Sequence, residues 1–200
     1  MKKVLKFPEL NAKVTIKQED SPESPRCWDN LGTCLFFHRN YDFGDKVDLS
    51  FSEWDLSTLA RVKVALEKKH NAVVILPVYM YDHSGQTINT TGFSCPWDSG
   101  QLGFIFVTRK KLLKEYGGKR VTAKIIERAT KVLEGEIQTL DQYIRGDVYG
   151  FIHKDLVTKK KDSCWGFYGD IFDNGVFDHL DIEGLTLDRY KEVFDNANWD

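Results

Sequence analysis

The longest periodic segment of this chain, residues 122–144, constrains the fold more than any other feature. Apolar side chains recur along it at helical spacing, which predicts one long amphipathic helix with a single buried face. This apolar stripe consists of Ile125, Ile126, Ala129, Val132, Leu133, Ile137, Leu140, Tyr143 and Ile144. Thr122 is suited to cap the start of the helix and Gly146 to end it. Because such a helix must bury its apolar face, we expect it to pack on a β-sheet.

Short β-forming segments lie on both sides of this helix in the sequence. The expected strands are 12–18, 33–38, 72–81, 86–91, 102–108, 147–153 and 163–168, and further helices are expected at 53–70, 109–116 and 187–196. Pro77 interrupts the most apolar strand and predicts an edge, a bulge or a kink there. Hairpin-like steps dominate and no regular strand–helix alternation occurs. The pattern therefore predicts an α+β fold, with a mainly antiparallel mixed sheet packed on one side by the long helix.

The length of 200 residues is typical of one domain, so we expect a single α+β domain over 1–200. Residues 1–24 would form an N-terminal strand and loop, and residues 170–200 a C-terminal helical extension. A hydrophobic fraction of 42% is enough for a core without disulfides.

The charge of the chain is nearly balanced, with a formal net charge of -2. Basic and acidic residues are spread along the sequence, which argues against a broad nucleic-acid surface. No apolar run is long enough for a signal peptide or a membrane span, so we expect no membrane association and a cytoplasmic location. In that compartment the cysteines are expected to be free thiols. The spacing of Cys27 and Cys34 is not that of a zinc site, no phosphate-loop motif occurs, and neither a metal nor a cofactor is expected.

Three segments combine tryptophan, glycine and small polar residues: 28–32, 93–101 and 163–169. Their rings could line one shared cleft and stack on a planar ligand such as a nucleotide, while neighbouring polar groups supply hydrogen bonds. The candidate ligand-binding residues are Trp28, Asp29, Asn30, Tyr81, Trp97, Asp98, Ser99, Gln101, Trp165 and Tyr168. The alternative is that these rings fill the core and anchor loops onto it. Tryptophan and tyrosine also favour interfaces, so a homodimer is a further possibility.

Cys95 is the candidate nucleophile if the protein is an enzyme. A reactive thiolate needs a neighbouring base, and His83 and His153 are the candidate partners for a cysteine-dependent hydrolase. The alternative is that Cys95 is a small apolar residue in a tight loop. His83 could also pair with Asp82 or Asp98, either to orient the imidazole or to hold the metal ion of a metal-dependent enzyme. The composition of 82–85 is that of a turn, which is the alternative.

Several segments resemble a family of uncharacterised proteins encoded by phages and other mobile elements. The resemblance covers about residues 25–169 and is carried by segments 28–32, 81–85, 94–104, 146–150 and 162–169. It transfers no catalytic residue. It implies a small accessory protein in the cytosol of a host bacterium, one that counters host defence by binding a nucleotide-type ligand or a host defence protein. A binding protein is therefore preferred to an enzyme, and the Cys95 hydrolase is the alternative.

Overall fold

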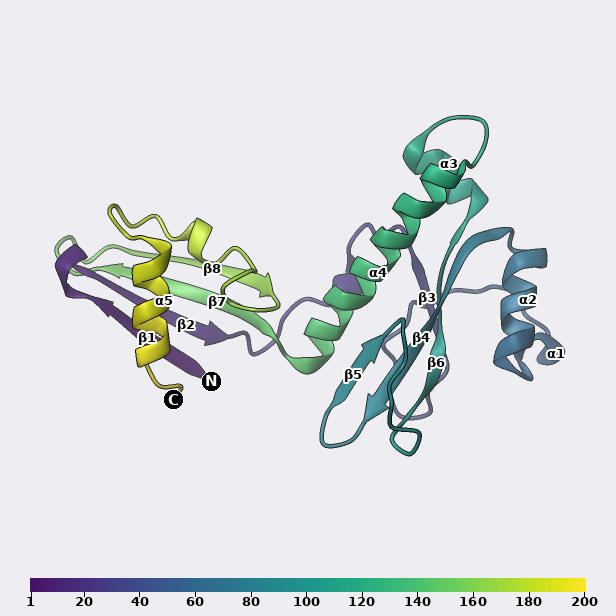
Figure 1. Ribbon diagram of the computed structural model, residues 1–200, viewed down its shortest axis with the longest axis horizontal. Coiled ribbons are helices and arrows are strands. Elements are labelled where there is room, and N and C mark those ends of the chain that lie inside the picture. Colours follow the sequence, from purple (N-terminus) through teal and green to yellow (C-terminus); the bar gives the residue numbers. More distant parts are fainter. The chain divides into compact units, whose positions relative to one another are not determined.

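The computed structural model describes residues 1–200 and contains two four-stranded sheets (Figure 1). Every strand pairing in both sheets is antiparallel, and five α-helices accompany the strands, so the predicted α+β class is confirmed. The chain divides into two compact units. Unit 1 comprises Met1–Glu23 and Gln142–Asp200, and unit 2 comprises Ser24–Asp141. The prediction of one domain stays a prediction, because compact units and independently folding domains are different properties.

The sheet of unit 1 has the strand order β1-β2-β7-β8. Its strands are β1 (Lys2–Phe7), β2 (Ala12–Gln18), β7 (Val148–Asp155) and β8 (Lys161–Tyr168). The pairing of β7 with β8 was predicted, whereas β1 was missed. Lysines interrupt its apolar residues, so the segment looked like a charged terminus, yet Leu5 and Phe7 are fully buried. Alternation along a short strand is easily hidden when long polar side chains occupy the other face.

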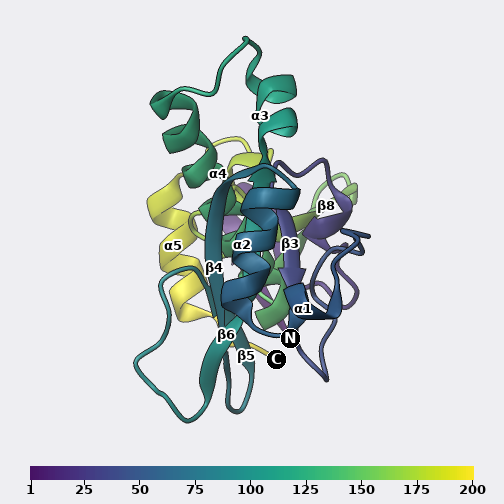
Figure 2. The ribbon, with the colours of Figure 1, turned by 90° about the vertical axis from the view of Figure 1, so that its right-hand side faces the viewer.

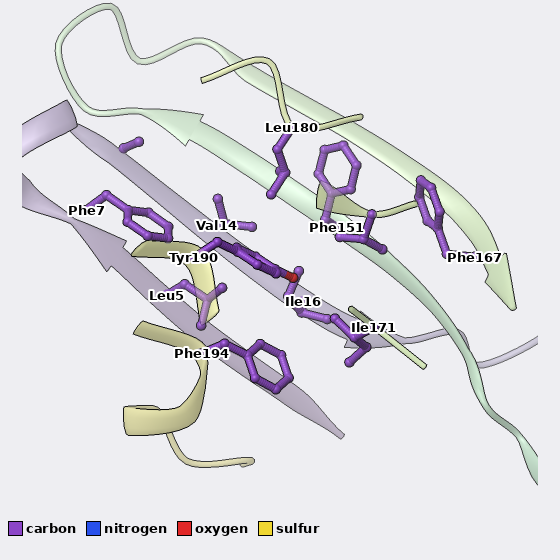
Figure 3. Close-up of a cluster of buried hydrophobic side chains, with 12 residues drawn as sticks. Leu5, Phe7, Val14, Ile16, Phe151, Phe167, Ile171, Leu180, Tyr190 and Phe194 are labelled. Carbon is purple, nitrogen blue, oxygen red and sulfur yellow. The ribbon is translucent and has the colours of Figure 1, made fainter. Parts of the chain in front are cut away.

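One face of this sheet is covered by residues 170–200, which include the 3-10 helix η3 (Phe177–His179) and helix α5 (Leu187–Asn196). Figure 3 shows the resulting apolar core, in which Tyr190 and Phe194 of α5 lie over Leu5 and Ile16 of the strands. The phenol oxygen of Tyr190 is buried without a hydrogen-bond partner. Burial raises the pKa of this phenol.

The sheet of unit 2 has the strand order β3-β6-β4-β5. Its strands are β3 (Thr33–Phe36), β4 (Ala72–Asp82), β5 (Gln86–Asn89) and β6 (Ser99–Thr108). The irregularity predicted at Pro77 is present. The short β5 pairs only with the segment Tyr79–Asp82, so β4 is an edge at Pro77, and the register shifts between Val78 and Tyr79. Proline has no backbone N–H to donate, and an edge tolerates this because no neighbouring strand requires that hydrogen bond.

The helices of unit 2 are α1 (Glu53–Leu56), α2 (Leu59–Lys69), α3 (Arg109–Tyr116) and α4 (Ala123–Arg145), the last of which ends in unit 1. The prediction of one helix over 53–70 was wrong, because the chain breaks between α1 and α2. The hydroxyl of Thr58 accepts a hydrogen bond from the Arg61 N–H at 3.2 Å and caps a new helix.

Two of these helices sandwich the sheet of unit 2. Helix α2 packs on one face, where Val62 and Leu66 contact Phe104 and Phe106 of β6. Helix α4 packs on the other face, as Figures 1 and 2 show. Its buried residues are Ala129, Leu133, Ile137 and Leu140, spaced at three and four positions. The buried stripe is narrower than predicted, because Ile126 and Val132 are 37% and 40% exposed. No helix is long and apolar enough to cross a membrane.

Candidate functional site

A buried ionic network shapes the loop that carries Trp28. The loop begins with the 3-10 helix η2 (Pro25–Cys27), and the guanidinium of Arg26 forms two parallel hydrogen bonds to Asp45, at 3.0 and 2.6 Å. A third bond joins Arg26 to Glu136 of α4 at 3.1 Å. The Arg26 side chain is only 8% exposed. Burial alone lowers the pKa of Arg26, but the bonds to the carboxylates outweigh it and raise that pKa, so the group stays charged.

Glu136 extends this network to the backbone of the loop. Its carboxylate accepts the N–H of Leu31 at 2.7 Å and the N–H of Gly32 at 3.1 Å. A Cβ on Gly32 would lie 2.6 Å from the Ile105 side chain and 2.9 Å from Glu136, so a larger residue does not fit. The loop is therefore fixed to β6 and α4 before any ligand binds.

This fixed loop forms one wall of a pocket of about 440 Å³ within unit 2. The lining residues are Trp28, Asp29, Asn30, Leu31, Lys111, Lys114, Glu115, Tyr116, Val132 and Glu136. Trp28 is 43% exposed. The Asn30 amide donates to the carbonyl oxygens of Pro25 and Trp28, at 2.8 and 2.9 Å, so it holds the backbone around the indole.

Helix α3 supplies the opposite wall and its positive charge. Neither Lys111 nor Lys114 is in an ion pair, while the Glu136 carboxylate is occupied by Arg26 and the loop backbone. The Arg128 guanidinium lies 5.2 Å from the centre of the Tyr116 ring. The pocket thus combines two aromatic rings and two lysine ammonium groups with the carboxylates of Asp29 and Glu115, in a volume suited to a small ligand.

Trp97 lines a different pocket, of about 300 Å³. Asp98, Ser99 and Gln101 also line it, and the Trp97 side chain is 92% exposed. Tyr81 is outside this lining; its ring centre lies 5.8 Å from that of Phe93. Because Trp28 and Trp97 line separate pockets, the prediction of one shared cleft was wrong for this pair.

Asp98 lies between the candidate catalytic residues of unit 2. The Cys95 thiol donates to Asp98 Oδ2 at 3.5 Å, and His83 Nδ1 lies 3.8 Å from Asp98 Oδ1. The Ser99 hydroxyl donates to the Cys95 carbonyl oxygen. Of the two carboxylates that the sequence offered to His83, Asp98 is the one that approaches its ring. Cys95, however, contacts a carboxylate and not an imidazole, and a nucleophilic thiol needs a base.

The remaining predicted site residues belong to unit 1. His153 is on β7 and lines a pocket with Asp155 and Asp181. Trp165 of β8 is 40% exposed and lies over Gly150, where a Cβ would come within 2.2 Å of the indole. The Tyr168 hydroxyl donates to the carbonyl oxygen of Glu23. Trp165 and Tyr168 are on strand β8, in agreement with the strand predicted for 163–168.

Sequence reasoning missed two groups of residues. Lys111, Lys114 and Tyr116 were assigned only to a helix, and no loop signal marks them. A pocket of about 400 Å³ in unit 1, lined among others by Tyr149 and Trp199, was also missed. Burial raises the pKa of Tyr149 there, and the nearby Asp147 and Asp170 raise it further.

No group of three or more histidine, cysteine, aspartate and glutamate side chains is placed to hold a metal ion. In comparisons with known proteins, no family model matches the chain, and no curated protein or solved structure matches it either.

Proposed function

We propose that this protein binds a small planar anion of the nucleotide type and catalyses no reaction on it. The binding site is the pocket that Trp28 lines together with Lys111 and Lys114, called the Trp28 pocket below. The observation that carries the proposal is the buried Arg26 network, which fixes the loop of Trp28 in a pocket that Lys111 and Lys114 also line. A loop ordered in advance loses little entropy when a ligand binds.

Two features of the pocket support this ligand class. An indole and a phenol offer flat surfaces for a base, and two unpaired ammonium groups can contact phosphate oxygens. The amide of Asn30 is already hydrogen-bonded to the loop backbone, so the hydrogen bonds that orient a ligand would come from Asp29 and the lysines. The wider role, in which such binding counters a bacterial defence, is part of the proposal and rests on the resemblance alone.

A thermal-shift screen of nucleotides and cyclic nucleotides, followed by calorimetric titration of the best ligand, tests the proposal. A ligand at one hundred times its Kd stabilises the folded protein by about 2.7 kcal/mol, which a melting curve resolves. We expect Trp28→Ala and Lys111→Ala to weaken binding at least tenfold.

Matched controls come from the same unit. Trp97→Ala removes a more exposed indole from a different pocket, and Lys68→Ala removes an exposed lysine of α2. Both should bind like the unmodified protein. If no nucleotide binds, or if Trp97→Ala weakens binding more than Trp28→Ala, the proposed site is wrong.

A further inference from the structure

The face of the unit 1 sheet opposite its core carries lysines in register across all four strands. Lys6 is paired with Lys13, Lys13 with Lys154, and Lys154 with Lys161. A second pair, Lys2 and Lys17, lies four residues further along. Because successive side chains alternate between faces, these lysines point away from Leu5, Val14 and Phe151 in the core.

No element of unit 1 contributes apolar cover on this face. The C-terminal segment with α5 packs on the other side, where it forms the core cluster. Lys6 and Lys161 are exposed, and Lys13 and Lys154 are partly exposed in the middle of the sheet. None of the four lysines in the row is in an ion pair.

Asp155 and Asp162 directly neighbour Lys154 and Lys161 along their strands, on the side of the core. Two further carboxylates lie at the end away from the lysine row. Asp20 is paired with Lys17, and Glu19 accepts a hydrogen bond from the Gly166 N–H at 3.1 Å. Most acidic residues of unit 1 lie elsewhere: residues 170–200 contain nine aspartates and glutamates against Arg189 and Lys191. The small net charge of the chain therefore hides a separation of charge between the two sides of this sheet.

Like charges directly opposite each other on neighbouring strands destabilise a sheet. Three consecutive pairs of this kind are therefore unfavourable for folding, and a bound polyanion would remove the repulsion. The long lysine stems let each ammonium reach solvent, where phosphate groups can contact it.

The same face carries an aromatic platform. Trp165 is opposite Gly150, and the absence of a side chain at Gly150 lets the indole lie against the sheet. Four residues separate Trp165 from Lys161 along β8, or about 13 Å of strand. An exposed aromatic ring beside lysines on an antiparallel sheet suits single-stranded nucleic acid, whose unpaired bases can stack on it. A duplex hides its base faces and would gain nothing from Trp165.

We propose that this lysine face binds single-stranded nucleic acid, with phosphates along the row Lys6, Lys13, Lys154 and Lys161 and a base on Trp165. This proposal departs from the expectation, drawn from the charge of the whole chain, that the protein has no broad nucleic-acid surface. It is independent of the Trp28 pocket.

Fluorescence anisotropy of a labelled single-stranded oligonucleotide with the full chain, measured over a series of salt concentrations, tests the proposal. Neutralising four phosphates gives a slope of log K against log salt of about -3. We expect Lys13→Gln combined with Lys154→Gln to weaken binding at least tenfold and to halve that slope. The variant with Lys6→Gln and Lys161→Gln, on the two edge strands, should also weaken oligonucleotide binding. It tests the proposal separately if the central substitutions impair folding.

Trp165→Leu separates stacking from charge. We expect about tenfold weaker binding with an unchanged salt slope, because stacking releases no counterions. The matched controls are Lys63→Gln combined with Lys68→Gln on α2, and Trp54→Leu, whose indole is 67% exposed. These controls, and Trp28→Ala, should leave oligonucleotide binding unchanged.

Three outcomes would overturn the proposal. The first is that the oligonucleotide does not bind at low salt. The second is that the control variant with Lys63→Gln and Lys68→Gln loses as much oligonucleotide affinity as the variants of the lysine row. The third is a preference for another polyanion, either duplex DNA bound as tightly as the single strand or phosphatidylserine vesicles bound when the oligonucleotide is not.

Discussion

The two units use their sheets differently, and the difference decides where each can bind a partner. In unit 2, α2 and α4 cover both faces of the sheet, so its exposed rings and charges lie in loops and pockets at the margins. In unit 1 only one face is covered, and the other offers a broad surface of lysines around Trp165. A sheet between two helical layers leaves only its ends and loops for function, whereas a two-layer arrangement leaves a whole face.

Charge is also handled differently in the two units. Unit 2 buries a charged network, with Arg26 between Asp45 and Glu136, and uses it to fix a loop. Unit 1 leaves the ammonium groups of its lysine row without carboxylate partners. Paired buried charges specify a conformation, while unpaired exposed charges are available to a ligand.

The largest expected effect comes from breaking the buried network. Arg26→Ala leaves the carboxylates of Asp45 and Glu136 without their cation, which costs about 3–5 kcal/mol of unfolding free energy. Urea denaturation measures this loss. Replacing an exposed arginine such as Arg120 should change stability by less than about 0.5 kcal/mol. A small effect of Arg26→Ala would show that the Trp28 loop is not fixed by this network.

A pair of glycine substitutions compares the two sheets directly. A Cβ on Gly103 of β6 would lie 2.1 Å from the backbone oxygen of Leu35. One on Gly150 of β7 would lie 2.2 Å from the partly exposed Trp165 indole and 2.9 Å from the backbone oxygen of Cys164. We expect Gly103→Ala to cost about 3 kcal/mol and Gly150→Ala about 1 kcal/mol, because a side chain moves more easily than a paired strand. Thermal melts of both variants check the order. Gly150→Ala should also weaken oligonucleotide binding, because it displaces the indole.

A single charge reversal tests whether repulsion among the lysines of the row lowers the unfolding free energy of the protein. Lys13→Glu places a carboxylate between Lys6 and Lys154, so we expect unfolding free energy to rise by about 0.5–1 kcal/mol while oligonucleotide binding falls. Denaturation and anisotropy on the same preparation measure both. If stability falls with binding, the lysines are needed for the fold.

Acid should remove a modest stabilisation that Asp55 contributes to unit 2. The Asp55 carboxylate accepts hydrogen bonds from Lys69 and from the Ser52 hydroxyl and N–H, which lower its pKa to about 2. A lowered pKa contributes stability that is present above about pH 4, the value of an unfolded aspartate, and is lost as pH falls toward 2. Melting temperatures of the protein and of Asp55→Asn should therefore converge in this interval. Curves that stay parallel would contradict the assignment.

Much of the fold could be predicted because it depends on local periodicity. Helices α3 and α5 begin and end where the pattern placed them, and the register of β7 with β8 follows from a short connection. The failures have local causes as well. Strand β1 was missed because lysines alternate with its apolar residues. The apolar spacing over 53–70 predicted one continuous helix, but the cap at Thr58 begins a second helix there.

The candidate sites were harder to predict because they depend on pairing between distant segments. The tryptophan segments were identified, and Trp28 does line a pocket, but its basic partners come from a helix about 80 residues away in the sequence. The expectation of no broad nucleic-acid surface rested on the net charge and on the spread of charges along the sequence, and neither contains information on which face a lysine occupies.

By itself, the sequence determined the α+β class, the long amphipathic helix and the residue types that could bind a ligand, since these depend on patterns within a few turns or strand residues. Only the tertiary structure decided that the strands form two sheets, that Trp28 and Trp97 line separate pockets, and that lysines from four strands stand in one row. The physical reason is that strand register joins residues far apart in the chain, and a shift of one residue in any of these strands would turn the lysine of that strand toward the core.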